Sequence, residues 1–208
     1  MKHIVAKNTG EAWIKASQEV MLNGLPVKDG EVNLKESLHV FLTIEDQISK
    51  DAITEKYADP TMIDWMRRNF FDFEPVLDWG YSYGQRFFNY DGINQIKNVI
   101  KKLKKNPESK SATISLMNPD GDKHHMPCIV AIDFKIRDNK LITTAFFRSQ
   151  DVGKKIYADI LCIGEIGQMI ASQLDLHLGE LHIHIVSLHV YEPDWDRVNK
   201  MIYQNEIR

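Results

Sequence analysis

The chain has 208 residues, of which 43% are apolar, 26% charged and 10% aromatic, a composition typical of a globular domain and not of a disordered chain. Its 26 basic and 29 acidic side chains give a formal charge of −3, which argues against a protein that holds nucleic acid mainly through the phosphates. Two cysteines are too few for a disulfide framework or a four-thiolate zinc site, and the sequence shows neither a signal-peptide pattern nor an apolar run long enough for a membrane span, so we expect a cytoplasmic protein.

Nothing in the sequence divides the chain, because internal repeats, low-complexity tracts and linkers rich in Pro, Gly or Ser are absent. We therefore predict a single domain over residues 1–208. In the first half, apolar spacing and β-branched runs predict, in order, a helix that begins at Thr9-Gly10-Glu11 and ends at Asn23-Gly24, a strand over Leu38–Ile44, a helix over Thr61–Phe71 and a lysine-bearing helix from Ile93 to Leu103.

The second half begins with three predicted strands and ends with a buried helix and a last strand. The strands cover Ala112–Leu116, Ile129–Ile136 and Leu141–Phe147, and the turn at 137–140 predicts a hairpin between the last two. The helix over Ile156–Leu174 is apolar almost all round and should be central, and Glu180–Tyr191 alternates like a strand. This order predicts an α+β fold with a mostly antiparallel or mixed sheet packed against helices.

Two cysteines differ in what they can do. Cys128 follows Met126-Pro127, where a polar loop becomes a strand, so a ligand can reach its thiol, although a half-buried structural cysteine would suit the same position. Cys162 lies within the apolar helix and is expected to be an inert core residue.

Polar residues around that helix suggest a binding site. Arg148 and Ser149 stand at a strand end before the helix, a pairing that suits an oxyanion such as phosphate but equally a surface salt bridge. Asp159 lies among isoleucines on the helix, where a carboxylate is costly unless it is paired. It occupies either an exposed stripe or a cleft, and we favour the cleft.

Histidines gather on the last predicted strand, which raises the question of a metal site. His182, His184 and His189 lie there, and His124-His125 precede Cys128. No carboxylate or cysteine stands beside them at a customary zinc spacing, so we predict no metal.

Taken together and in order, these pieces resemble the thymidylate synthase superfamily from about Trp79 to Trp195. The residues that carry the resemblance are Tyr83-Gly84 with Arg86, then Asn106-Pro107-Glu108-Ser109-Lys110, Met126-Pro127-Cys128, Arg148-Ser149 with Asp151, and Ser187-Leu188-His189-Val190-Tyr191. The resemblance implies a thymidylate synthase-like fold and a homodimer that packs sheet against sheet and shares its active sites.

The resemblance also implies roles for single residues. Cys128 matches the nucleophile that adds to C6 of a pyrimidine, and the positive charge of Arg148 would favour its thiolate. The other implied roles are phosphate binding by Arg148 and Ser149, phosphate binding across the dimer by Lys110, ribose binding by His189 and Tyr191, folate contact by Asp151, and an active-site tyrosine at Tyr83. The family's water-organising glutamate has no firm match; Asp64 is the best-placed candidate and Glu74 another.

The departures from the family pattern narrow the substrate. Asp159 replaces the asparagine that reads N3–H and O4 of uracil, and an aspartate here resembles the cytidylate hydroxymethylases of the superfamily. A carboxyl group can accept from the amino group of cytosine and stabilise a proton on N3. Ile129 and Phe147 replace the usual histidine and glutamine, and Lys154-Lys155-Ile156-Tyr157 replaces the folate-binding loop.

The resemblance thus predicts a pyrimidine nucleotide C5 hydroxymethyltransferase that converts CMP or dCMP with 5,10-methylenetetrahydrofolate and water. Two alternatives stay open. One is a thymidylate synthase that methylates dUMP, against which Asp159 argues. The other is a nucleotide-binding protein without catalysis, suggested by Ile129 and the altered folate loop.

Overall fold

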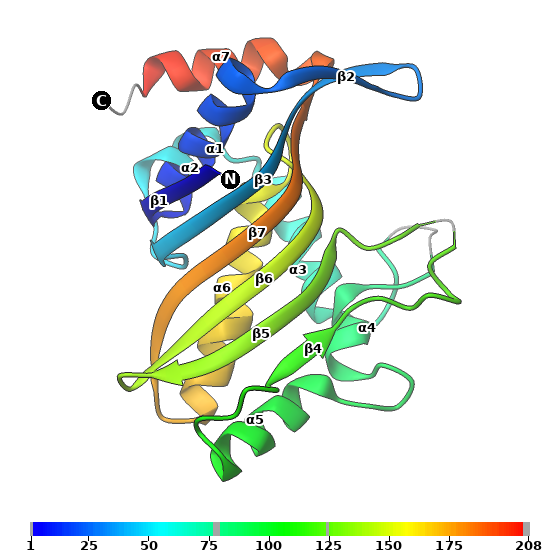
Figure 1. The fold of residues 1–208 in the computed structure, drawn as a ribbon, viewed down its shortest axis with the longest axis vertical. Coiled ribbons are helices and arrows are strands. Elements are labelled where there is room, and N and C mark those ends of the chain that lie inside the picture. The colour runs from blue at the N-terminus through cyan, green and yellow to red at the C-terminus, as the bar shows by residue number, and fades with distance from the viewer. Residues whose placement is uncertain (1, 77–79, 124, 206–208) are drawn as a thin grey trace.

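A computed structural model describes residues 2–76, 80–123 and 125–205. These residues form an α+β domain with a mixed sheet, as the sequence predicts (Figure 1). The strands are β1 (Lys2–Asn8), β2 (Leu25–Asp29), β3 (Val32–Asp46), β4 (Thr113–Ser115), β5 (Ile129–Arg137), β6 (Lys140–Asp151) and β7 (His177–Tyr191). The helices are α1 (Thr9–Asn23), α2 (Ala52–Tyr57), α3 (Pro60–Phe71), α4 (Tyr83–Phe88), α5 (Gln95–Lys105), α6 (Ile156–Gln173) and α7 (Trp195–Gln204), with a 3₁₀ turn at Glu192–Asp194.

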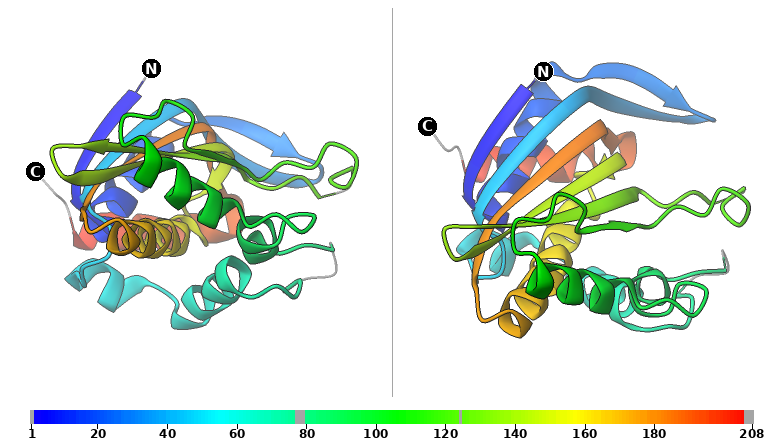
Figure 2. Two further views of the ribbon diagram at one scale, coloured as in Figure 1. Left: turned by 90° about the horizontal axis from the view of Figure 1, so that it is seen from below. Right: turned by 60° about the horizontal axis from the view of Figure 1, so that its bottom comes forward.

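The sheet runs in the order β1-β3-β7-β6-β5-β4, and β2 forms a hairpin with β3. β1 pairs with β3 and β6 with β7 in parallel, whereas the other pairings between described strands are antiparallel. The parallel pair β6–β7 requires a crossover, which α6 provides. Helices α1, α3 and α6 lie on one side of the sheet (Figure 2), and its opposite face presents half-buried or exposed side chains such as Phe41, Phe146 and His184.

Helix α6 is the centre of the core, as predicted. Its isoleucines at 156, 160, 163, 166 and 170 are fully buried, because α6 packs against β6 and β7 on one side and against α1 and α3 on the other. A helix that is apolar all round is stable in water only when it is covered in this way. No helix in the described ranges is both long and apolar enough to cross a membrane.

The set of side chains that the sheet turns towards the helices changes halfway along the central strands. On β7 the buried side chains include Ile183 and Ile185, then Leu188 and Val190, so the alternation slips by one residue around Val186. Arg148 of β6 and His39 of β3 lie beside Val186 on the two neighbouring strands. His39 has a φ of 55°, outside the extended region. The slip turns the polar ends of β6 and β7 towards the start of α6.

Several elements differ from the sequence prediction. Helix α1 is capped by Asn8, whose side chain accepts from the backbone N–H of Glu11, so Thr9 already lies in the helix. Helix α5 is capped by Asn94, which leaves Ile93 outside it and half exposed. The sequence analysis did not predict β1, β2, α2, α4 or α7, which are short or largely exposed.

Candidate active site

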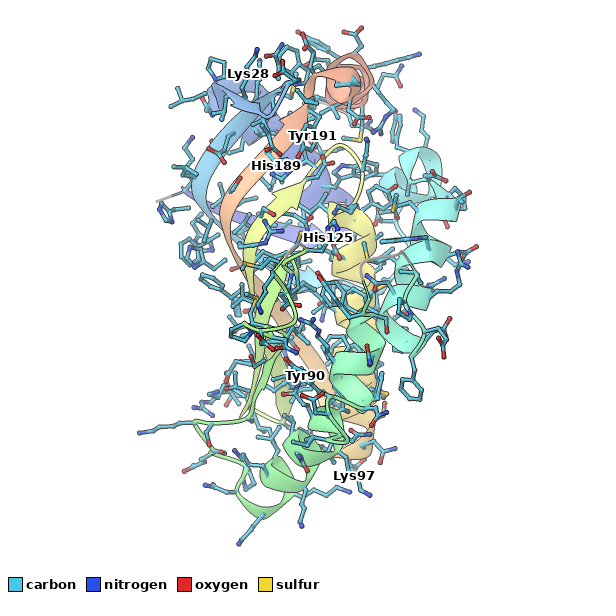
Figure 3. The ribbon with its side chains drawn as sticks, turned by 90° about the vertical axis from the view of Figure 1, so that its right-hand side faces the viewer. Lys28, Tyr90, Lys97, His125, His189 and Tyr191 are labelled. Atoms are coloured by element: carbon cyan, nitrogen blue, oxygen red, sulfur yellow. The ribbon has the colours of Figure 1, made fainter. Side chains whose placement is uncertain are left out.

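One cavity of about 600 Å³ opens where the ends of β6 and β7 meet the start of α6, within the usual range for small-molecule sites. Its walls come from the β2–β3 hairpin, α3, α4, the segment before β5 and the ends of β6 and β7. Lys28, Tyr191, His189 and His125 lie along this side of the molecule (Figure 3). The residues predicted from sequence that line it are Tyr83, Cys128, Arg148, Ser149, Asp151, Asp159, His189 and Tyr191.

Cys128 places a thiol in the wall of the cavity. Its Sγ lies 3.5 Å from the hydroxyl of Ser149 and 4.0 Å from Nη2 of Arg148. The sheet holds the three together, because the backbone N–H of Arg148 donates to the carbonyl of Cys128 over 2.9 Å. The sulfur therefore lies between a guanidinium group and a hydroxyl group at the wall of the cavity.

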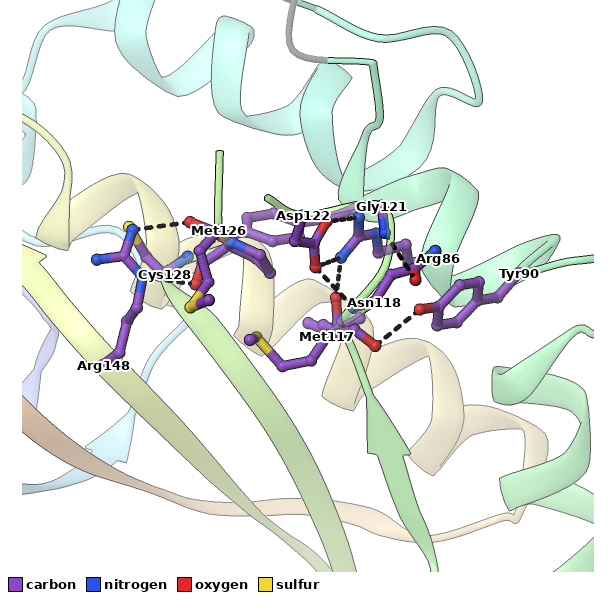
Figure 4. A network of polar contacts seen from close by, with 12 residues as sticks. Arg86, Tyr90, Met117, Asn118, Gly121, Asp122, Met126, Cys128 and Arg148 are labelled. Carbon is purple, nitrogen blue, oxygen red and sulfur yellow. Dashed lines mark hydrogen bonds and ion pairs between the residues drawn. The ribbon is translucent and has the colours of Figure 1, made fainter. Parts of the chain in front are cut away.

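Arg148 is held in place by the segment that leads into β5. Its Nε donates to the carbonyl of Pro127 over 3.0 Å and its Nη2 to the carbonyl of Met126 over 2.7 Å, while Nη1 donates to Ser149 over 3.2 Å (Figure 4). The guanidinium fork is therefore oriented before any ligand arrives, and such a fork suits a phosphate.

A second arginine anchors the other end of that segment. Arg86 forms a buried ion pair with Asp122, and Asp122 also accepts from the backbone N–H of Asn118 over 2.6 Å (Figure 4). The ring of Tyr81 lies 3.7 Å from the Arg86 guanidinium. Arg86 and Arg148 thus fix the two ends of the segment that carries Cys128.

The Tyr83 hydroxyl holds the backbone at Cys128 by hydrogen bonds. Its hydroxyl accepts from the backbone N–H groups of Cys128 and Ile129 over 3.1 and 3.3 Å. Burial, with Cys128 and Asp159 nearby, raises the pKa of Tyr83 well above its ordinary value. The phenol therefore keeps its proton at neutral pH and can donate a hydrogen bond into the cavity.

Asp159 supplies a buried carboxyl group to the cavity, as favoured from the sequence. Its side chain accepts a hydrogen bond of 2.9 Å from Nε2 of Gln150 and is 3% exposed. Burial raises the pKa of Asp159 to about 6, while Lys155 and the Gln150 hydrogen bond act in the opposite direction. This carboxyl group can hold or release a proton near neutral pH.

A buried acid and a buried histidine face each other across β6 and β7. Asp151 is the register partner of His189, and its carboxylate accepts from the backbone N–H of Gly153 over 2.7 Å. Burial raises the pKa of Asp151 and lowers that of His189. His189 Nδ1 lies 3.3 Å from the carbonyl of Ser187, which assigns the ring proton to Nδ1 and leaves Nε2 to accept.

Tyr191 is the last residue of β7 and lines the cavity. Its hydroxyl donates to Asp29 of the β2–β3 hairpin over 3.1 Å, and burial raises the pKa of Tyr191 to about 12. The hydroxyl therefore stays protonated and remains a donor at neutral pH.

Other predicted site residues lie elsewhere. Asp64 is exposed on α3, which turns Trp65, Met66 and Asn69 towards the cavity instead, and Glu74 is exposed outside it. Lys110 is exposed and does not line the cavity of its own chain.

The second cysteine and the histidines lie apart from this chemistry. Cys162 is fully buried in α6, where burial raises the pKa of its thiol. His182 and His184 lie on the open sheet face, and His124 is outside the described residues. Within the described part of the chain, no three His, Cys, Asp or Glu side chains are grouped to hold a metal ion.

Sequence reasoning missed several polar residues of this region, among them Glu36, Asn69, Gln150 and Lys155. Asn69 accepts from the backbone N–H of Tyr83 over 3.2 Å. The signal for Lys155 was its place in the loop that departs from the family pattern, whereas Glu36 comes from a strand whose first half was not predicted.

Comparisons with known proteins identify the family of the chain. The family model described as thymidylate synthase matches residues 37–207. The chain is 30% identical over 203 residues to a protein of Methanosarcina mazei, covering 96% of this chain and 94% of that one, and 29% identical over 203 residues, with the same coverage, to a protein of Methanococcoides burtonii. It is 24% identical over 216 residues to a protein of Methanothermobacter thermautotrophicus, covering 96% and 97%. All three carry the name putative thymidylate synthase.

Proposed function

The chain belongs to the thymidylate synthase family, a family of one-carbon transferases, and on that premise we propose that it is a pyrimidine nucleotide C5 hydroxymethyltransferase. Its substrate would be CMP or dCMP, with 5,10-methylenetetrahydrofolate as the one-carbon donor and water as the source of the hydroxyl group. The observation that carries the proposal is the buried carboxyl group of Asp159 in the wall of the cavity that holds Cys128.

Asp159 would read the base. At N3 and C4, cytosine offers a ring acceptor and an amino donor, whereas uracil offers an N–H donor and a carbonyl acceptor. A carboxyl group that carries a proton near pH 6 can donate it to N3 and accept from the amino group with its other oxygen. A proton on N3 draws electrons from C6, where the thiolate adds, so the same contact binds and activates cytosine.

Cys128 would form the covalent bond to C6, which makes C5 nucleophilic towards the one-carbon unit. Ser149 and Arg148 lie against the sulfur, and Tyr83, held by two backbone N–H groups, offers a proton within the same cavity. These groups are positioned by β5, β6 and α4, which are all tied to the core, so the geometry requires little rearrangement before reaction.

The remaining polar groups would hold the sugar, the phosphate and the donor. Arg148 and Ser149 suit the phosphate, His189 Nε2 and the Tyr191 hydroxyl suit ribose, and Asp151 suits the folate. Folate supplies the one-carbon unit when bound. The proposed contact with the folate rests on Asp151, whose carboxyl group is buried and has a raised pKa. Such a group can both donate and accept hydrogen bonds, which suits a folate ring that carries donors and acceptors.

We further propose a homodimer that packs through the open sheet face, where Phe41 stacks on His184 and Phe146 meets the same ring edge-on. Exposed aromatic side chains at the centre of a sheet face favour burial against a partner. In such a dimer the exposed Lys110 would reach the phosphate bound by the other chain.

The test is kcat/KM for CMP, dCMP, UMP and dUMP with methylenetetrahydrofolate, with products identified by mass spectrometry. Wild type should prefer cytidylates, because uracil would leave a buried hydrogen bond at Asp159 unmade, at a cost of about 1–3 kcal/mol. Asparagine can make that hydrogen bond to uracil, so Asp159→Asn should shift the preference towards uridylates by about 5- to 150-fold. An unchanged ratio would place Asp159 away from the base and remove the reason for preferring cytosine.

Two other functions are decided by the same assays. The names of the relatives favour a thymidylate synthase, which would convert dUMP to a methylated product without hydroxymethylcytidylate. A nucleotide-binding protein without catalysis would release no tritium from C5-labelled CMP, dCMP or dUMP.

A further inference from the structure

Lys155 is a lysine of the cavity that lies near two buried acids without pairing with either in the described part of the chain. Lys155 lines the cavity beside Asp151 and Asp159, and its ammonium group makes no hydrogen bond or ion pair within the described residues. Its neighbour Lys154 points away, 55% exposed, with its Nζ 3.8 Å from Asp194. Two adjacent lysines thus occupy different surroundings.

The position of Lys155 is unfavourable for the helix itself. Lys155 is the N-cap residue of α6 and makes no capping hydrogen bond with its side chain. N-caps are normally Ser, Thr, Asp or Asn, and a cation at the positive end of a helix dipole is disfavoured. A residue that weakens the helix start yet faces the cavity is better explained by its effect on the cavity.

That effect falls first on Asp159, for which Lys155 is the foremost group that opposes burial, and to a lesser extent on Asp151 and His189. The backbone N–H of Asp159 donates to the carbonyl of Lys155 over 3.0 Å, so the two side chains lie one helical turn apart on the same face. Tyr83 of α4 and Cys162 of α6 are the other ionisable groups that interact with Asp159, and both are neutral at ordinary pH. Gln150 of β6 contributes a neutral hydrogen bond.

The other nearby charges are engaged elsewhere. Arg67 of α3 pairs with Glu165 further along α6, over 2.6 Å. Arg148 donates to the carbonyls of Met126 and Pro127, and the buried pair Asp151–His189 lies across β6 and β7. Lys155 is therefore the cation that acts most directly on the Asp159 carboxyl group.

We propose that Lys155 is a positioning residue for Asp159, whose ammonium group opposes the effect of burial so that the carboxyl group can release as well as hold the proton that it shares with N3 of the pyrimidine. The inference rests on the proposed role of Asp159. Burial favours the protonated carboxyl group, and the positive charge one helical turn away in the same cavity wall lowers the free energy of the anion. A proton donor matched to the working pH is the most effective catalyst.

The test is the pH profile of kcat/KM for the preferred cytidylate. One limb of that profile should be absent in Asp159→Asn, which assigns the limb to Asp159. In Lys155→Met the same limb should move to higher pH, changing the ratio of variant to wild-type rate across the limb by about 3- to 10-fold. Lys155→Arg keeps the charge and should restore the wild-type limb, and Lys154→Met is the matched control that should leave it in place.

A second readout does not depend on turnover. The ¹³C resonance of the Asp159 carboxyl carbon, assigned by its loss in Asp159→Asn, should titrate at higher pH in Lys155→Met than in wild type. If Asp159→Asn removes the limb but Lys155→Met shifts neither limb nor resonance, the role of Lys155 is wrong while the proposed function stands. If Asp159→Asn changes neither the limb nor the base preference, the proposed function itself fails.

Discussion

Replacing Asp159 by asparagine should make the protein more stable at neutral pH, although it removes a site residue. The folded state raises the pKa of this carboxyl group from 3.8 to about 6, since the side chain is 3% exposed. At about 1.4 kcal/mol per pH unit, ionised Asp159 costs the folded state roughly 3 kcal/mol. Asparagine carries no charge and still accepts from Gln150, but its buried amide N–H groups offset part of the gain. We expect a net increase of about 1–3 kcal/mol.

The pH dependence identifies the cause of that gain. A group whose pKa is raised by folding destabilises the protein fully above the folded-state pKa and has no effect below the unfolded-state pKa. The gap between Asp159→Asn and wild type should therefore be largest above about pH 7 and shrink as pH falls through 6. Below the unfolded-state pKa of 3.8 the charge no longer contributes, because Asp159 is then neutral in both states, and only the cost of the buried amide groups remains. In a chain of this size the gap at neutral pH corresponds to a rise in Tm of roughly 2–10 °C.

Urea unfolding followed by tryptophan fluorescence at fixed protein concentration measures this gap. The control is Asp64→Asn on the exposed side of α3, which should leave the free energy of unfolding unchanged at every pH. A gap for Asp159→Asn that is the same at pH 4.5 and pH 7.5 would refute the argument, because it would show that asparagine acts through packing and not through charge.

Further predictions concern the nucleophile, the phosphate and the second chain. Cys128→Ser should abolish turnover but leave nucleotide affinity within a few-fold, measured by calorimetry; turnover in that variant would eliminate covalent addition by Cys128. Arg148→Ala should weaken nucleotides by about 1.5–3 kcal/mol more than nucleosides, and an equal loss for both would exclude a phosphate contact. Mixing Cys128→Ser chains with Lys110→Ala chains should restore one intact site per mixed dimer, and no recovery of activity would argue that Lys110 does not act across the dimer.

The parts of the fold that could be predicted from sequence are those whose burial is one-sided or complete. Helix α6 was predicted to within one residue at its end because apolar residues surround it on all sides, and the β5–β6 hairpin followed from its turn. β2 could not be predicted, since every residue of Leu25–Asp29 is exposed and its place depends on β3.

The residues of the candidate site also divide into those that could be predicted from sequence and those that could not. Cys128, Arg148 and Asp159 could be found because each breaks the pattern of its own segment. Glu36 and Asn69 could not, because only the pairing of β3 with β7 and the packing of α3 bring them to the cavity. Asp64 was the natural choice from residue type alone, yet the helical rotation of α3 turns it outward.

The order of the strands has a consequence for how the protein acquires its binding site. The cavity joins Lys28 of an early hairpin to Cys128 and Tyr191, and its floor exists only when β7 has inserted between β3 and β6. β7 is the last strand in the chain, and closing such distant contacts is slow compared with forming helices and hairpins. Nucleotide affinity should accordingly be among the last properties to appear during refolding, and a bound nucleotide stabilises only molecules in which β7 has inserted.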